Sequence, residues 1–518
     1  MIKTAIFVII LFLTFFVRLE AIKNHNLPFT TDQGRDMIDI RSIAVGHKPR
    51  LIGPTTSING VYLGPFWYYF NLPPFIASGG DPSSLLIWQI IWYQLAGLSL
   101  YLFLKKENPT LALFTSVFFL IMPLGFNTSR YSWNANAMPI FTVFFILALF
   151  TLIRNQTPQK SFITGLLAGL SLQVEAAFGV IFFPFAFLYL LSFTKKLKTH
   201  FGLFLGFLIT LIPQGVFELR HQFPLTKVLL TEFSGKSTML GQRLSLSQRL
   251  DDRIGVLIAL VRDSSHLPES FLFPVFIVTC FMALILIFKK NQTKFNWQFL
   301  LLNISFILFT LIFFLAFPQP LKGWYLLGLS VPLVLLYSSS LASIYSLGDL
   351  RLNLALVILV ASSFYFTFLA QSEYLSVSQQ MGSANRSSLK NSLADLDWVY
   401  RHADGQGFRA YSYLPSIYDY PYQYLYWWYG PKEYGYQPNE VAYLPNRPEY
   451  IENMQTYLTK TRPLLENEPT FLIIEKDEQN PAFEKAWKGN FSTFCEVEKV
   501  AFAFPVEIRH LENCGQTK

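Results

Sequence analysis

The chain has 518 residues, of which 52% are hydrophobic, 17% aromatic and only 14% charged, and its mean hydropathy is +0.34. Soluble globular proteins carry about a quarter charged residues, so this composition excludes an ordinary soluble protein and predicts a polytopic membrane protein. The net charge of +8 lies largely in short loops between apolar runs, where lysine and arginine set membrane topology, and it does not indicate a nucleic-acid partner.

About eleven stretches are apolar enough to cross a bilayer, whose hydrocarbon core of about 30 Å needs about 20 helical residues. They are 4–20, 83–104, 110–126, 137–153, 161–176, 178–193, 201–218, 270–288, 297–316, 324–345 and 351–370. No Ala-x-Ala cleavage site follows the first stretch, so we expect an uncleaved membrane helix rather than a signal peptide. The apolar run 62–78 contains Pro65, Pro73 and Pro74, which favour a helix lying in the interface.

The positive-inside rule predicts the topology. Alternate loops carry basic residues, namely Lys105 and Lys106, Arg154 and Lys160, Lys195, Lys196 and Lys198, Lys289, Lys290 and Lys294, and Arg351. These loops lie on the same side as Lys3, which is therefore predicted to be cytoplasmic. The long polar segments 21–82, 127–136, 219–269 and 371–518 are then outside, and we expect a multi-pass protein of the cytoplasmic membrane.

The composition changes near residue 371 to mixed polar sequence with a strand-like run at 470–474 and a second apolar run at 500–508. We therefore predict a membrane domain over 1–370 and a soluble extracytoplasmic α/β domain over 371–518. The ring-rich stretch 418–430 could stack on sugars or anchor this domain to lipid headgroups. Cys495 and Cys514 could form a disulfide in an oxidising compartment, and the three cysteines do not have metal-site spacing.

The first outer loop, 21–82, carries the most informative polar residues, Asp32-Gln33-Gly34-Arg35-Asp36. We expect a short interfacial helix from Gly34 to residue 45, with Asp32 capping its start and Asp36 on its first turns. An ionised aspartate at the membrane rim can accept a proton or hold a cation. The alternative is that Asp32 only caps the helix.

Further polar groups fall on the same predicted side of the membrane. Candidates for phosphate or donor contacts are Arg35, Arg130, Arg220, His221 and Lys322, because arginine and lysine hold phosphate. Candidates for sugar or acceptor contacts are Tyr62, Tyr68, Trp133, Asn134, Asn136, Glu175 and Glu218, several of them in the polar loop 127–136. The alternative for each cation is snorkelling to the interface.

These motifs resemble a known family when they are taken in order. The acidic loop after the first span, the segment Gly64-Pro65-Phe66-Trp67-Tyr68-Tyr69, the loop around Trp133, and Phe217-Glu218-Leu219-Arg220-His221 look like those of the C-type (GT-C fold) integral-membrane glycosyltransferases. The resemblance is to the bacterial branch of the protein O-mannosyltransferase and aminoarabinose-transferase superfamily. It covers about residues 1–345.

The resemblance implies transfer of a hexosyl or pentosyl group from a polyprenyl-phosphate donor to a protein, lipid or glycan acceptor on the outer face, with inversion at the anomeric carbon. Asp32 matches the family's general base. Many relatives have Asp-Glu where this chain has Asp32-Gln33, which leaves open whether Asp36 is a second catalytic carboxylate. No cofactor is required by the motifs, although Asp32, Asp36 and Glu175 could hold Mg²⁺ or Mn²⁺.

Two other classes of function remain open from the sequence. A transporter or flippase of lipid-linked saccharides usually places its polar site near the midplane and often shows paired halves. Here the polar groups lie mainly at one rim, and an odd span count with a large outer domain fits a transporter poorly. A polysaccharide polymerase or ligase would use an arginine-rich late outer loop. Loop 219–269 contains Arg243, Arg249, Arg253 and Arg262 and keeps that reading open.

Overall fold

The computed structural model describes residues 2–234, 242–264, 293–381, 387–416, 418–445, 454–502 and 505–514, together with Val278, Phe281, Met282 and Ile285. Its contacts divide the chain into two compact units. The first unit, called the membrane unit here, comprises Met1–Leu19, Pro49–Asn71 and Leu86–Ser372. The second, called the sheet unit, comprises Glu20–Lys48, Leu72–Leu85 and Glu373–Lys518.

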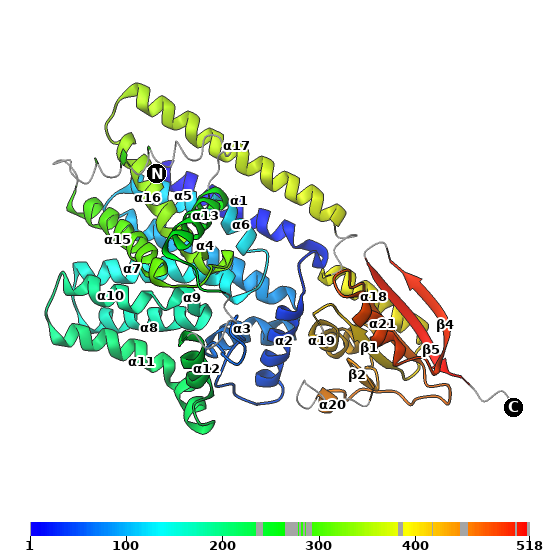
Figure 1. Cartoon of the computed structure of the whole chain (residues 1–518). Helices are drawn as coiled ribbons and strands as arrows, with labels where there is room; N and C mark the ends of the chain where they lie inside the picture. Colours follow the sequence, from blue (N-terminus) through cyan, green and yellow to red (C-terminus); the bar gives the residue numbers. More distant parts are fainter. Residues whose placement is uncertain are drawn as a thin grey trace. The chain divides into compact units, whose positions relative to one another are not determined.

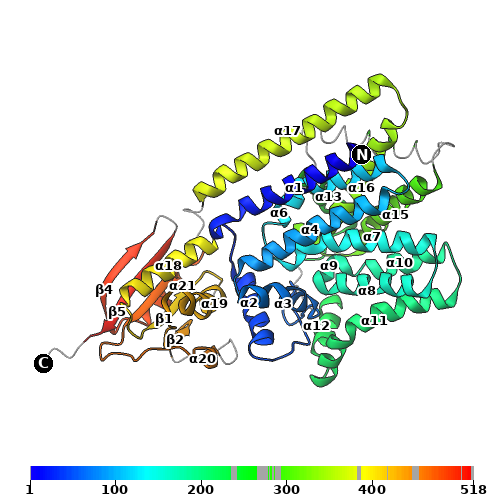
Figure 2. The same cartoon turned by 180° about the vertical axis from the view of Figure 1, so that it is seen from behind.

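The membrane unit is helical (Figure 1). Its elements, including those that continue into the sheet unit, are α1 (Ile2–Ala21), α3 (Phe66–Ser78), α4 (Ser83–Leu104), α5 (Pro109–Ile121), α6 (Pro123–Thr128), η2 (Asn134–Ala137), α7 (Met138–Arg154), α8 (Pro158–Val174), α9 (Ala176–Gly179), α10 (Phe182–Leu191), α11 (Leu197–Arg220), α12 (Pro224–Phe233), α13 (Leu246–Ser264), α15 (Lys294–Ala316), η3 (Gly323–Leu329), α16 (Ser330–Tyr345) and α17 (Leu350–Met381). Helices α8, α10 and α11 lie side by side in both views (Figures 1 and 2).

Seven stretches of the described chain are long and apolar enough to span a bilayer. They are Ile2–Ala21, Ser83–Leu104, Asn134–Arg154, Leu197–Arg220, Lys294–Ala316, Gly323–Tyr345 and Leu350–Glu373, and each corresponds to a predicted span. Three other predicted spans form shorter helices, 110–126 as α5 and α6, 161–176 as α8, and 178–193 as α9 and α10. The predicted span 270–288 lies largely outside the described residues. A polytopic helical protein is thus confirmed.

Proline explains why the predicted span 110–126 is interrupted. Helix α5 ends at Ile121, and Met122 has the extended ψ of 125° that a residue before proline favours. Pro123 then begins α6 as its first residue, where a missing backbone N–H costs nothing.

A second proline pair shapes α3. Pro73 and Pro74 lie inside this helix, and Pro74 has no N–H to donate to the carbonyl of Phe70. The indole Nε1 of Trp88 donates to that carbonyl instead, at 2.9 Å. A neighbouring helix thereby satisfies the backbone acceptor that proline leaves open, as membrane helices require.

The sheet unit contains η1 (Lys23–His25), α2 (Thr31–Ala44), α18 (Leu389–His402), β1 (Arg409–Tyr413), α19 (Tyr420–Tyr429), η4 (Gly430–Tyr434), β2 (Glu440–Ala442), α20 (Met454–Tyr457), β3 (Thr470–Glu475), α21 (Pro481–Gly489), β4 (Phe494–Ala501) and β5 (Val506–Asn513). The strand order is β2-β1-β3-β5-β4. Strand β1 runs parallel to β2 and β3, and β5 runs antiparallel to β3 and β4. The predicted small α/β domain is confirmed.

Two details of the sheet unit differ from the sequence expectation. The apolar run 500–508 is not one strand, because it covers the end of β4 and the start of β5. The ring-rich stretch 418–430 forms α19, and Tyr422, Tyr424 and Tyr426 are fully buried in it. These three rings are core residues, so they neither stack on a sugar nor reach lipid headgroups.

The predicted division at residues 370 and 371 stays a prediction, and the contacts add one feature to it. Part of the predicted first outer loop, Glu20–Lys48, and the segment Leu72–Leu85 pack with the C-terminal residues in the sheet unit. The backbone N–H of Leu389 donates to the carbonyl of Leu27 at 2.8 Å, and the Tyr424 hydroxyl donates to the carbonyl of Gly80 at 2.5 Å.

Cys495 and Cys514 are joined by a disulfide that connects the start of β4 to the residue after β5. The bridge closes a loop with a sequence separation of 19 residues. Loop-closure entropy then predicts that Cys514→Ser lowers the free energy of unfolding of the sheet unit by about 3 kcal/mol. Thermal unfolding of the purified protein measures this, with dithiothreitol expected to lower the midpoint of the native protein but not that of the variant.

Buried carboxyls make the stability of the sheet unit depend on pH. Burial raises the pKa of Asp419 from 3.8 to about 7, and burial likewise raises the pKa of Asp395 well above its ordinary value. Since the folded state holds these protons more tightly, the stabilisation is complete below pH 3.8 and is lost as the pH rises towards 7.

We therefore expect the free energy of unfolding of the sheet unit to fall between pH 4 and pH 7, by up to about 1.4 kcal/mol per pH unit for each such group. Asp419→Asn is expected to reduce this slope, with Asp395 supplying the remainder. Urea denaturation at pH 5 and pH 8 is the measurement, and an equal slope in the variant and the native protein would contradict the assignment.

Candidate functional site

The acidic motif lies on the first turns of α2. Helix α2 begins at Thr31 with Thr30 as its N-cap, so the expectation that Asp32 caps a helix starting at Gly34 is wrong. Thr30 forms a capping box with Gln33, whose Oε1 accepts from the Thr30 backbone N–H at 3.0 Å and from its hydroxyl at 2.7 Å. Thr30 and Gln33 therefore cap the N-terminus of α2, and Asp32 is not the capping residue.

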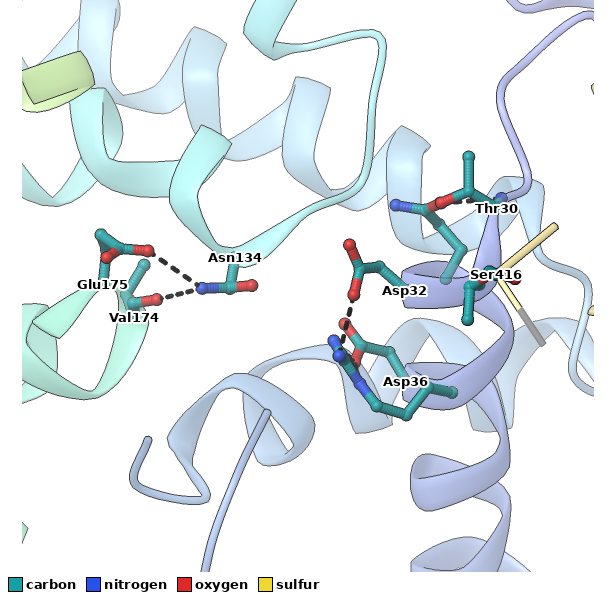
Figure 3. Close-up of polar contacts among 10 residues, drawn as sticks. Thr30, Asp32, Asp36, Asn134, Val174, Glu175 and Ser416 are labelled. Atoms are coloured by element: carbon teal, nitrogen blue, oxygen red, sulfur yellow. Dashed lines mark hydrogen bonds and ion pairs between the residues drawn. The ribbon is translucent and has the colours of Figure 1, made fainter. Parts of the chain in front are cut away.

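Arg35 bridges the two aspartates (Figure 3). Its Nη1 lies 2.8 Å from Asp32 Oδ1, and its Nη2 lies 2.8 Å from Asp36 Oδ1. The Asp32 side chain is 40% exposed, whereas that of Asp36 is 3% exposed. Asp36 thus anchors the guanidinium, and the guanidinium orients the accessible carboxylate of Asp32. The predicted phosphate contact of Arg35 stays a prediction. In this structure its guanidinium forms ion pairs with Asp32 and Asp36.

Close packing fixes α2 within the sheet unit. A Cβ on Gly34 would lie 2.5 Å from the backbone N of Pro421, so only glycine lets α2 approach α19 this closely. Thr31 Oγ1 and Ser416 Oγ are 2.8 Å apart. Further along α2, Arg41 is buried with its guanidinium 4.0 Å from the ring centroid of Tyr457, and burial lowers its pKa to about 10. These contacts make α2 a rigid support for Asp32.

A second polar group lies in the membrane unit, where α8 ends and α9 begins. Asn134 Nδ2 donates to the carbonyl of Val174 at 2.7 Å and approaches Glu175 Oε2 at 3.5 Å (Figure 3). Glu175 caps α9, since its Oε1 accepts from the backbone N–H of Ala177 at 3.3 Å. Asn134 and Glu175, which are far apart in the sequence, are thus brought together.

Lys322 and two tryptophans extend this group. Lys322 is close enough to Glu175 for an electrostatic interaction, and its Nζ lies 5.3 Å from the ring centroid of Trp324. The rings of Trp324 and Trp133 are 5.6 Å apart. We call Trp133, Asn134, Glu175, Lys322 and Trp324 the Glu175 group. It combines rings, an amide, a carboxylate and an ammonium, which are the groups that bind sugars and phosphates.

Of the other predicted residues, Asn136 joins the Glu175 group through its backbone N–H, which donates to the carbonyl of Trp133 at 3.0 Å. Glu218 accepts hydrogen bonds from the backbone N–H groups of Leu225 and Thr226 and so caps α12. Arg220 and His221 are exposed at the end of α11.

The remaining candidates are more enclosed. Arg130 is buried beside Phe126 and donates to Gln371. Asn136 donates to the carbonyl of Tyr131 at 2.9 Å, Tyr68 is buried, and Tyr62 is half-buried with its carbonyl bound by Gln214. Substrate contacts for these residues stay predictions.

Comparisons with known proteins identify the architecture. Residues 75–216 match the family model of the dolichyl-phosphate-mannose-protein mannosyltransferases. The chain resembles ArnT from Cupriavidus metallidurans bound to undecaprenyl phosphate, with a TM-score of 0.60 at 12% sequence identity, covering 98% of this chain and 97% of that one. The chain has the GT-C glycosyltransferase fold.

Other GT-C structures agree. The apo state of the same ArnT matches with a TM-score of 0.54 and 12% identity over 98% of this chain and 97% of that chain. The Archaeoglobus fulgidus oligosaccharyltransferase in complex with zinc and sulfate matches with a TM-score of 0.50 and 11% identity, over 94% of this chain and 71% of that one. No curated protein matches in sequence. The resemblance drawn from the sequence motifs is therefore confirmed at the level of fold.

One residue of this GT-C chain was missed by the sequence reasoning. Gln173 lies in the apolar run of α8, where its Oε1 accepts from the backbone N–H of Phe66 at 3.0 Å and its Nε2 donates to the carbonyl of Thr210. A Cβ on Gly64 would lie 2.3 Å from the Gln173 amide, which explains the glycine of the Gly64-Pro65 motif. The sequence signal that could have identified Gln173 is its position as an amide side chain among apolar residues.

The residues present do not fit a divalent metal as they stand. Within the described ranges, no three histidine, cysteine or acidic side chains converge on one point. Asp32 and Asp36 are bridged by the Arg35 guanidinium, whose positive charge lies between the two carboxylates that a shared cation would need. A bound Mg²⁺ or Mn²⁺ stays a prediction, and no chemical step below depends on one.

Proposed function

We propose that this GT-C protein transfers a sugar from a polyprenyl-phosphate-linked donor to an acceptor hydroxyl on the outer face of the cytoplasmic membrane. The observation that carries the proposal is the exposed carboxylate of Asp32, held by Arg35 at the start of a rigid helix. The structural similarity to an ArnT bound to undecaprenyl phosphate supports a lipid-linked donor.

The proposed reaction is a single displacement with inversion. Asp32 accepts the proton of the acceptor hydroxyl while the hydroxyl oxygen forms a bond to the anomeric carbon. The bond from that carbon to the donor phosphate oxygen breaks, and its electron pair leaves with the lipid phosphate. Lys322 offsets the charge that develops on the phosphate, and Trp133 and Asn134 offer a ring and an amide to the sugar.

The arginines of the late outer loop give little support to a polymerase or ligase. Arg253 donates to the carbonyls of Phe314 and Phe317, and Arg249 donates to the carbonyl of Leu315. Both guanidinium groups therefore cap the C-terminal end of α15, and their use is structural. A transporter or flippase is the other alternative, in which the lipid-linked sugar moves without cleavage.

The test is sugar transfer from a panel of radiolabelled polyprenyl-phosphate monosaccharides, hexoses and pentoses, by the full-length protein in proteoliposomes. Release of free polyprenyl phosphate together with labelled acceptor supports the transferase. Movement of intact labelled donor to the opposite leaflet, with no release of polyprenyl phosphate, would overturn it in favour of a flippase.

A further inference from the structure

A groove runs between the first turns of α8 and α11 in the membrane unit. Its volume is about 750 Å³, which lies within the range of small-molecule sites. The walls are Phe162 and Ile163 from α8 and Phe201 and Leu205 from α11, and Lys198 also lines the groove. Phe201 is 61% exposed, so this apolar surface is open to the surroundings of the protein.

The two helices form the groove because they touch through their backbones. A Cβ on Gly206 would lie 2.1 Å from the carbonyl oxygen of Phe162, and one on Gly165 would lie 2.0 Å from that of Leu203. Such glycine contacts draw membrane helices together. The large side chains of both helices are then displaced to the sides of the contact, and they border a groove rather than fill it.

Three lysines lie where α11 begins, and one of them, Lys198, lines the groove. Lys195, Lys196 and Lys198 are all exposed in the segment that leads into α11. Within the described part of the chain, the ammonium groups of these three lysines form no ion pair or hydrogen bond. A basic cluster beside an apolar groove between membrane helices is complementary to a lipid with an anionic headgroup.

We propose that this groove binds one anionic glycerophospholipid. Its acyl chain lies between Ile163 and Phe201, and its phosphate contacts Lys195, Lys196 and Lys198. The site is separate from the Glu175 group, because Glu175 follows the last residue of α8 whereas the groove is at the first turn. The 17 residues of α8 correspond to about 25 Å along the helix axis. The proposal does not depend on the glycosyltransferase reaction.

The test is native mass spectrometry of the delipidated full-length protein with phosphatidylglycerol and, separately, phosphatidylcholine. We expect one phosphatidylglycerol to be retained under conditions that remove phosphatidylcholine. The variant Lys195→Gln/Lys196→Gln/Lys198→Gln should weaken that binding by about 100-fold, taking about a factor of five for each lysine. Ile163→Trp keeps the charges but fills the groove, and it should also weaken binding.

Lys105→Gln/Lys106→Gln removes charge from a different loop and is the matched control, expected to bind phosphatidylglycerol normally. Unchanged thermal midpoints establish that each variant is folded. Equal retention of both lipids, unchanged binding in the triple variant, or an equal loss in the control would overturn the proposal. Undecaprenyl phosphate is the third lipid tested. If the triple variant loses undecaprenyl phosphate and still binds phosphatidylglycerol normally, the proposal is overturned and the groove is assigned to the carrier lipid.

Discussion

Asp32→Asn is expected to lower sugar transfer by about 10²–10⁴-fold, the usual contribution of a general base. Asparagine keeps the size of the side chain and a hydrogen-bond acceptor for Arg35, but it cannot take the acceptor proton. The Asp32 carboxylate is 40% exposed, so its loss should leave the fold intact. Turnover of a lipid-linked donor in proteoliposomes measures the effect, and donor binding is expected to persist.

Glu107→Gln provides a matched control, because Glu107 is a half-exposed carboxylate that pairs with Arg154 at 2.8 Å. It belongs neither to the acidic motif of α2 nor to the Glu175 group. Its turnover should equal that of the native protein. Native turnover in Asp32→Asn would remove Asp32 as the base and direct attention to Asp36 or Glu175.

Arg35→Met is expected to destabilise the sheet unit by about 3–5 kcal/mol, because it removes the positive charge that Arg35 places beside a buried carboxylate. That carboxylate is Asp36, whose side chain is only 3% exposed. The substitution also frees Asp32 to change rotamer, so the remaining folded protein should turn over more slowly. Urea denaturation followed by tryptophan fluorescence measures the first effect, and the transfer assay measures the second.

The double variant Arg35→Met/Asp36→Asn separates these effects. It removes the buried charge, so most of the lost stability should return, whereas the orientation of Asp32 should not. Lys23→Met is the control, since its ion pair with Glu20 is 62% and 52% exposed and should contribute less than about 1 kcal/mol. A double variant as unstable as Arg35→Met would show that the buried charge is not the cause.

The surroundings of Asp32 show which part of the candidate site the sequence predicted, while the catalytic role of Asp32 stays a prediction. Asp32 was singled out because a carboxylate beside a membrane span needs solvent or a partner, and the structure supplies both. The N-cap was misassigned because Thr30 and Asp32 are both good capping residues, and the choice depended on the side chain of Gln33. Helix ends are set by such local competition, which composition does not resolve.

The sequence by itself determined that the chain is a polytopic membrane protein, because the length of apolar runs is measured directly against the bilayer. Ordered motifs also determined the GT-C resemblance, and the polar C-terminal third predicted a separate α/β domain. Only the tertiary structure decided that Arg35 is held by Asp36, that Asn134 meets Glu175, and that Arg249 and Arg253 cap α15. Except within α2, these pairings join residues that are distant in the chain, and their free energy comes from burial and geometry that no local pattern encodes.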